Sequence, residues 1–178
     1  MRTFRNEIIN FSMEQTMLEL QTELPHLSEE RILETLYDKD PDEWASADYE
    51  KNNYKSENLK QITSRGLKVR SKSEALIAES LYQYNLAFRY EQVMHFNGLT
   101  LVPDFVIRRY DGKLFYWEHQ GLTNDKKYIE HQMKKAQIYA SAGIVPWDNY
   151  IVTYDNETGV DLRRIDFEIQ NRLLNPAV

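Results

Sequence analysis

The sequence predicts an α/β domain in which helices cover a mixed β-sheet. Apolar residues recur at helical spacing in two segments, 71–84 and 128–141. Three strand-like segments lie between them and are joined by Asn-Gly and Asp-Gly turn signals. A β-branched strand over 150–154 and a closing helix over 162–174 follow. The core order is therefore α-β-β-β-α-β, which is typical of layered α/β folds.

Residues 1–57 are expected to form an acidic helical extension and linker in front of a domain over residues 58–178. Apolar spacing indicates one helix before Pro25 and a second after Ser28, a suitable N-cap. Their apolar stripes allow two alternatives, a homodimer through the N-terminal helices or folding back on the domain. Residues 38–58 are acidic and aperiodic, so we expect an irregular wrap held by aromatic anchors. The expected anchors are Trp44, Tyr49 and Tyr54.

Composition narrows the class of protein. The 178-residue chain has no cysteine, which excludes disulfides and thiolate chemistry. It contains no apolar run near the ~20 residues of a membrane span, and its N-terminus lacks a signal-peptide pattern. We therefore expect a soluble, cytoplasmic protein. The net charge of −6 is uneven, because residues 1–57 hold 14 acidic and 6 basic side chains and residues 58–178 hold 14 and 16.

The three central strands are expected to form two hairpins. Residues 88–94 and 99–108 read as strands on either side of an Asn-Gly turn, with Pro103 inside the second strand. Asp111-Gly112 then suits a two-residue type I′ turn, and 114–119 is the returning strand. A bulge at Pro103, which cannot donate a ladder hydrogen bond, is expected to adjust the register of this second hairpin.

Acidic side chains are predicted to meet at one end of this hairpin. The bulge would bring Asp104 level with Glu118, and Gln120 shares a strand face with Glu118. Glu74, near the start of the preceding helix, can lean over the same end. Converging buried carboxylates are stable only if one is protonated or a cation lies between them. Hard oxygen ligands suit Mg²⁺ (or Mn²⁺), which can activate water for phosphodiester hydrolysis.

This ordered set of motifs resembles the PD-(D/E)XK nuclease superfamily. The motifs are PD at 103–104, EHQ at 118–120 and the helical Glu74, and the resemblance extends over residues 63–155. It is nearest to an uncharacterised bacterial and phage-associated branch. The resemblance implies a restriction-endonuclease-like core and Mg²⁺-dependent cleavage of DNA. It also implies that Asp104 and Glu118 bind the metal and that Glu74 assists the metal or its water.

Gln120 stands where the family motif usually has a lysine that orients the attacking water. A glutamine can form hydrogen bonds but supplies no charge. Lys135 is the expected substitute, with Lys134 and Lys127 behind it, and Lys135 shares a helix face with Tyr139. His119 should point to the opposite sheet face from Glu118, so we expect it either to be structural or to support the residues of the site.

A basic run precedes the first core helix and contains no acidic residue. We expect it to bind DNA phosphates. Its members are Lys60, Arg65, Lys68, Arg70 and Lys72. The sequence thus predicts a Mg²⁺-dependent deoxyribonuclease, and the alternative is a nuclease-fold module that binds nucleic acid within a larger assembly without catalysis.

Overall fold

The computed structural model describes residues 41–96, 98–109, 111–121, 126–157 and 159–174. The two helices expected before and after Pro25 lie outside the described residues, and so does the predicted homodimer contact. Among the described helices, none is both long enough and apolar enough to cross a membrane.

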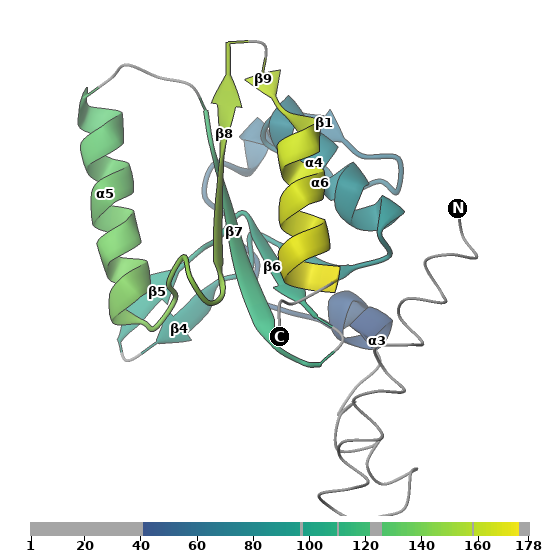
Figure 1. The fold of residues 1–178 in the computed structure, drawn as a ribbon, viewed down its shortest axis with the longest axis horizontal. Helices are drawn as coiled ribbons and strands as arrows, with labels where there is room; N and C mark the ends of the chain where they lie inside the picture. Colours follow the sequence, from purple (N-terminus) through teal and green to yellow (C-terminus); the bar gives the residue numbers. More distant parts are fainter. Residues whose placement is uncertain (1–40, 97, 110, 122–125, 158, 175–178) are drawn as a thin grey trace, which may run out of the picture. The chain divides into compact units, whose positions relative to one another are not determined.

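A five-stranded mixed sheet forms the centre of the described unit (Figure 1). Its strands β7 and β8 are parallel, and the other neighbouring pairs are antiparallel. The helix α5 (Lys126–Ser141) connects the parallel pair, because parallel neighbours need a crossover. The predicted mixed α/β class is confirmed. The strand order is β3 (Ala87–Tyr90), β6 (Phe105–Arg108), β7 (Leu114–Gln120), β8 (Tyr150–Asn156) and β9 (Gly159–Val160).

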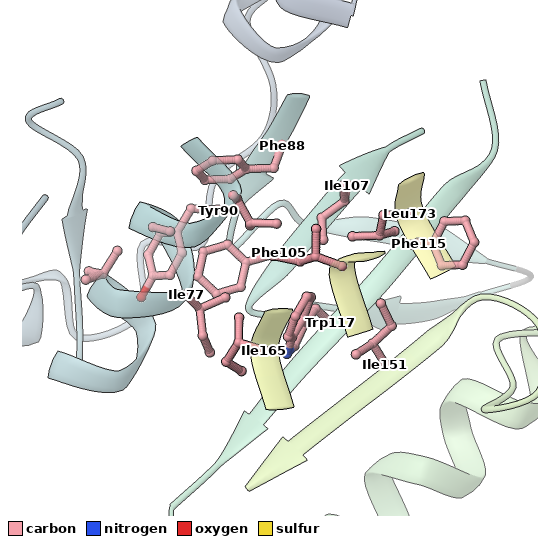
Figure 2. Packing of buried hydrophobic residues seen from close by; sticks show 14 residues of the cluster. Ile77, Phe88, Tyr90, Phe105, Ile107, Phe115, Trp117, Ile151, Ile165 and Leu173 are labelled. Atoms are coloured by element: carbon pink, nitrogen blue, oxygen red, sulfur yellow. The ribbon is translucent and has the colours of Figure 1, made fainter. Parts of the chain in front are cut away.

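Apolar clusters cover both faces of this sheet. On one face, α4 (Lys72–Gln83) and α6 (Leu162–Glu168), which continues as the π-helical η2 (Ile169–Leu174), pack over Phe105, Trp117 and Ile151 (Figure 2). On the other face, Tyr139 of α5 packs with Tyr116 of β7 and Tyr150 of β8. Because side chains alternate along a strand, β7 contributes Trp117 to the first face and Tyr116 to the second.

The helix predicted over 71–84 is α4. The Ser71 hydroxyl accepts a hydrogen bond from the Glu74 backbone N–H at 3.1 Å, so Ser71 is the N-cap. Ile77 of this helix is buried in the core, whereas the neighbouring Leu76 is exposed. The helix predicted over 128–141 is α5, and Gly143 follows it at φ +79°, the left-handed conformation expected after a helix.

The strands predicted over 88–94 and 99–108 form one hairpin that is interrupted halfway. Its inner part pairs β3 with β6, and its outer part pairs β4 (Met94–Phe96) with β5 (Leu99–Leu101) in the same register. Glu91 has φ 46° at the interruption, and it lies opposite the segment that contains Pro103. The prediction of two continuous strands is therefore wrong, because a left-handed residue and a proline break the ladder.

The predicted type I′ turn at Asp111-Gly112 is also wrong. The Arg109 N–H donates to the Lys113 carbonyl at 2.9 Å, so three residues lie in the loop, and of the described pair only Gly112 has positive φ. Phe105 pairs with Trp117 in this register. One step further along the two strands, Asp104 lies opposite Glu118, so the loop length and not a bulge at Pro103 brings the two acids level.

Residues 41–70 precede the first core helix, and Arg89 of β3 holds part of this segment against the sheet. The Arg89 guanidinium lies 4.3 Å from the Trp44 ring and 4.9 Å from the Tyr49 ring. These two aromatics are anchors as predicted, but the Tyr54 ring is 69% exposed, so that anchor is wrong. The segment comprises α3 (Pro41–Ser46), η1 (Ser56–Asn58), β1 (Gln61–Ile62) and β2 (Lys68–Val69).

Candidate active site

Glu118 is a buried carboxylate near the end of β7, and two side chains of α5 hold it. Its Oε2 lies 2.7 Å from the Lys135 ammonium, and its Oε1 accepts a hydrogen bond from the Tyr139 hydroxyl at 2.6 Å. Lys135 and Tyr139 are one helical turn apart, so they reach the sheet side by side. Burial raises the pKa of Glu118, and the Lys135 ammonium opposes that rise. Lys135, the expected substitute for the motif lysine, thus lies beside this acid, and its catalytic role stays a prediction.

Lys135 stays protonated in this surrounding. Burial by itself would lower the pKa of its ammonium, but the charges of Glu118 and Asp104 outweigh burial and raise that pKa. Burial also raises the pKa of the Tyr139 hydroxyl, as does the Glu118 charge, so Tyr139 acts here as a hydrogen-bond donor. The site therefore contains one firmly held positive charge.

Asp104 lies between the two parts of the interrupted hairpin. Its Oδ2 accepts a hydrogen bond from the His119 backbone N–H at 2.7 Å. Burial raises the pKa of Asp104 well above its usual range, and the negative charge of Glu118 adds to this rise, whereas Lys135 opposes it. Asp104 and Glu118 thus face each other across β6 and β7 and interact as like charges.

Glu74 is held at the start of α4. Its Oε2 accepts hydrogen bonds from the Tyr90 hydroxyl at 2.5 Å and from the Arg70 backbone N–H at 3.0 Å. Its negative charge raises the pKa of both Asp104 and Glu118, which makes it a third acid of the same cluster. The structure therefore brings the three predicted acids into electrostatic contact from three different elements.

Gln120 lies on the same strand face, two residues beyond Glu118, and lines a groove beside α5. Its side chain makes no hydrogen bond with any of the residues described. It therefore stands next to the acids and is not bound to them.

His119 points to the other sheet face, as predicted. Its ring nitrogens lie 2.8 Å from the Thr153 hydroxyl and 2.9 Å from Asp155 Oδ1. The Ser73 hydroxyl of α4 also donates to Asp155 Oδ1 at 2.9 Å. This network was not predicted, although alternation along β8 places Thr153 and Asp155 on one face. It ties the ends of β7 and β8 to the first turn of α4, next to Glu74.

The basic run divides into exposed and engaged members. Lys60, Lys68 and Lys72 are exposed. Arg70, by contrast, forms an ion pair with the buried Glu91 at 2.5 Å and donates to the backbone carbonyls of residues 54 and 55. Its guanidinium thus links the segment around residues 54 and 55 to Glu91 of the interrupted hairpin, so its hydrogen-bond donors are occupied by contacts within the protein.

Arg65 is exposed, and its guanidinium stacks 4.5 Å from the Tyr82 ring. Four of the five residues predicted to contact phosphate are therefore exposed at the surface.

The acid cluster offers carboxylate oxygens, which are the ligand type that Mg²⁺ prefers. However, across the residues that the structure describes, no three His, Asp or Glu side chains stand close enough to form a ready ligand set. Both Glu118 oxygens already accept hydrogen bonds, so an ion would compete with Lys135 and Tyr139 for them.

Comparison with known proteins identifies one uncharacterised relative. The chain is 31% identical over 88 residues to the uncharacterized protein MJ1519 of Methanocaldococcus jannaschii, and the match covers 49% of this chain and 7% of that protein. The chain thus spans a small part of the length of the relative that it matches. No protein-family model and no solved structure matches the chain.

Proposed function

We propose that the protein is a metal-dependent nuclease that hydrolyses DNA phosphodiester bonds, with a restriction-endonuclease-like core. The carrying observation is the acid pair Asp104 and Glu118. Asp104 directly precedes β6 and lies opposite Glu118 of β7, and Lys135 supplies a positive charge to the pair. The order α4, the β3–β6 hairpin, β7, α5 and β8 agrees with the element order that the resemblance implies.

In this proposal, Asp104 and Glu118 hold Mg²⁺ (or Mn²⁺), and Glu74 supports the same site from α4. A bound Mg²⁺ would polarise a phosphoryl oxygen and lower the pKa of a bound water. Burial and the nearby Glu118 charge raise the pKa of Asp104, and a cation between the two carboxylates would offset both effects.

Lys135 takes the place of the motif lysine in this proposal. Its ammonium stays protonated and can stabilise negative charge at the scissile phosphate or orient water. Tyr139 holds Glu118 from the other oxygen and so positions the carboxylate. The exposed lysines of the basic run, Lys60, Lys68 and Lys72, provide phosphate contacts away from the reacting group.

The test is cleavage of plasmid, linear duplex and single-stranded DNA with Mg²⁺ or Mn²⁺, compared with EDTA. Asp104→Asn keeps an oxygen that accepts the His119 N–H but removes the carboxylate charge. Changes to residues that only support metal ligands lower activity by about 10–100-fold, so loss of this proposed ligand should lower cleavage at least about 100-fold. Glu130→Gln, an exposed acid on α5, is the matched control and should cleave as the unchanged protein does. Absence of cleavage on all three substrates, or equal cleavage by Asp104→Asn, contradicts the proposal.

The second candidate is a nuclease-fold module that binds nucleic acid without cutting it. The observations that favour it are the uncharged Gln120 at the motif position and the engagement of both Glu118 oxygens. DNA binding without metal-dependent cleavage, together with no heat of Mg²⁺ binding in calorimetry, would support this candidate over the first.

A further inference from the structure

A groove of about 460 Å³ lies between α5 and the ends of β7 and β8, and we call it the α5–β8 groove. The N-terminal half of α5 leaves its apolar side chains open, since Met133 is 63% exposed and Ile129 is 44% exposed. Tyr154 of β8, across the groove, is 62% exposed. Exposed apolar side chains gathered in a hollow commonly mark a binding site.

The chemistry of the groove suits a flat ring with a polar edge. Tyr128 and Tyr154 supply aromatic faces, and Met133 supplies a polarisable thioether. The Gln120 amide, which has no partner in the described part of the chain, can both donate and accept a hydrogen bond. Asp155 at the groove lining is held by Ser73 and His119, so its carboxylate is committed to the fold. An unpaired nucleobase has these properties.

The charge of the groove wall complements a phosphate backbone. The helix α5 carries four lysines and one acidic residue, Glu130, in a chain whose net charge is −6. Lys126 is exposed in the first turn of this helix, next to the groove-lining Tyr128 and Ile129, and Lys135 reaches Glu118 beside the groove. Aromatic faces beside a basic helix form the combination that binds single-stranded nucleic acid.

We propose that the α5–β8 groove binds unpaired bases of single-stranded DNA and presents the adjoining phosphate to the acid cluster. Tyr154 stacks on a base, the Gln120 amide contacts the base edge, and Lys126 binds the backbone. A base inside a duplex is covered on both faces by its neighbours and cannot enter such a groove. This inference rests on the proposed nuclease function, whose substrate class it narrows.

Binding without catalysis tests the inference separately from cleavage. The full chain in EDTA is titrated against labelled single-stranded DNA, duplex DNA and single-stranded RNA of one length, with fluorescence anisotropy as the readout. We expect the single-stranded DNA to bind at least about tenfold more tightly than the duplex. Tyr154→Ala removes one base-stacking contact, so it should bind the single-stranded DNA about fivefold to 150-fold more weakly. Phe167→Ala, an equally exposed aromatic on α6, is the control and should bind unchanged.

Two further measurements identify the occupant. Lys126→Ala should reduce the slope of log affinity against log salt by about 0.7, the value for one phosphate contact on a single strand. Sedimentation checks self-association: a dimer that Tyr154→Ala dissolves would mean that a second copy fills the groove, which overturns the proposal. Equal affinity for duplex and single strand, tighter binding of RNA than of DNA, or equal effects of Tyr154→Ala and Phe167→Ala would also overturn it. Because all binding is measured in EDTA, failure of the cleavage test leaves these results unchanged.

Discussion

Replacing Lys135 by methionine removes the cation that pairs with Glu118 and keeps the aliphatic packing. The Glu118 side chain is 4% exposed and that of Lys135 is 26% exposed, so the change leaves an unpaired charge in a nearly dry position. Breaking a buried ion pair from one side costs about 3–5 kcal/mol, and the partial exposure of Lys135 places the expectation at the lower end, about 3 kcal/mol. For a chain of this size, that loss lowers the melting temperature by about 6–12 °C.

The assay is thermal unfolding followed by circular dichroism at pH 8 and pH 5. Without Lys135 the pKa of Glu118 rises further. A carboxyl group whose pKa is raised in the folded state makes the fold less stable as pH rises. The penalty should therefore be larger at pH 8 than at pH 5. Adding Glu118→Gln should recover much of the loss, because it removes the unpaired charge itself.

Lys134→Met is the matched control, because Lys134 is the neighbouring exposed lysine on α5. It should change stability by less than about 0.5 kcal/mol. If Lys135→Met unfolds within a degree of Lys134→Met, or if Glu118→Gln gives no recovery, then Glu118 is not held as a charged, buried partner of Lys135 and the electrostatic reasoning about the site fails.

Three further changes have expected outcomes. Asp104→Asn should stabilise the fold at pH 7 by about 0.5–2 kcal/mol, which raises the melting temperature by about 1–8 °C, because burial and the Glu118 charge disfavour the Asp104 carboxylate. This gain should vanish as pH falls toward about 4, and scanning calorimetry across pH checks it. Arg70→Met should destabilise the fold by about 3 kcal/mol in urea unfolding, because it leaves Glu91 buried and unpaired, whereas Lys68→Met should change little. Ser71→Ala should cost about 1 kcal/mol in the same assay through loss of the α4 cap, and an unchanged midpoint would contradict the capping assignment.

Local signals in the sequence were sufficient for the element order and for much of the site. Helical spacing located α4 and α5, and the i, i+4 relation of Lys135 and Tyr139 predicted that both reach one place, where both bind Glu118. Strand alternation predicted that His119 turns away from Glu118. These inferences succeed because the spacing of apolar residues along a helix, and the sheet face to which a strand side chain points, depend only on nearby residues.

The features that the sequence did not reveal depend on contacts between distant residues. Arg70 looked like a phosphate ligand because its neighbours are basic, but Glu91, 21 positions later, takes its guanidinium. The left-handed φ of Glu91, which splits the hairpin, has no signal in a stretch without glycine or asparagine. Asp-Gly favours a two-residue turn in isolation, but the strand register sets a three-residue loop here.

The interruption of the hairpin gives the Pro103-Asp104 pair a physical meaning. Proline cannot donate to a ladder, so the pairing between β6 and its neighbours begins only at Phe105. The His119 N–H of β7 lies beyond Trp117, the last β7 residue that pairs with β6, and would be left without a strand partner on that side. The Asp104 carboxylate accepts this N–H at 2.7 Å and so takes the place of a strand carbonyl. The residue that ends the ladder thereby becomes a fixed member of the site, opposite Glu118 and close enough to Lys135 for its charge to act on Asp104.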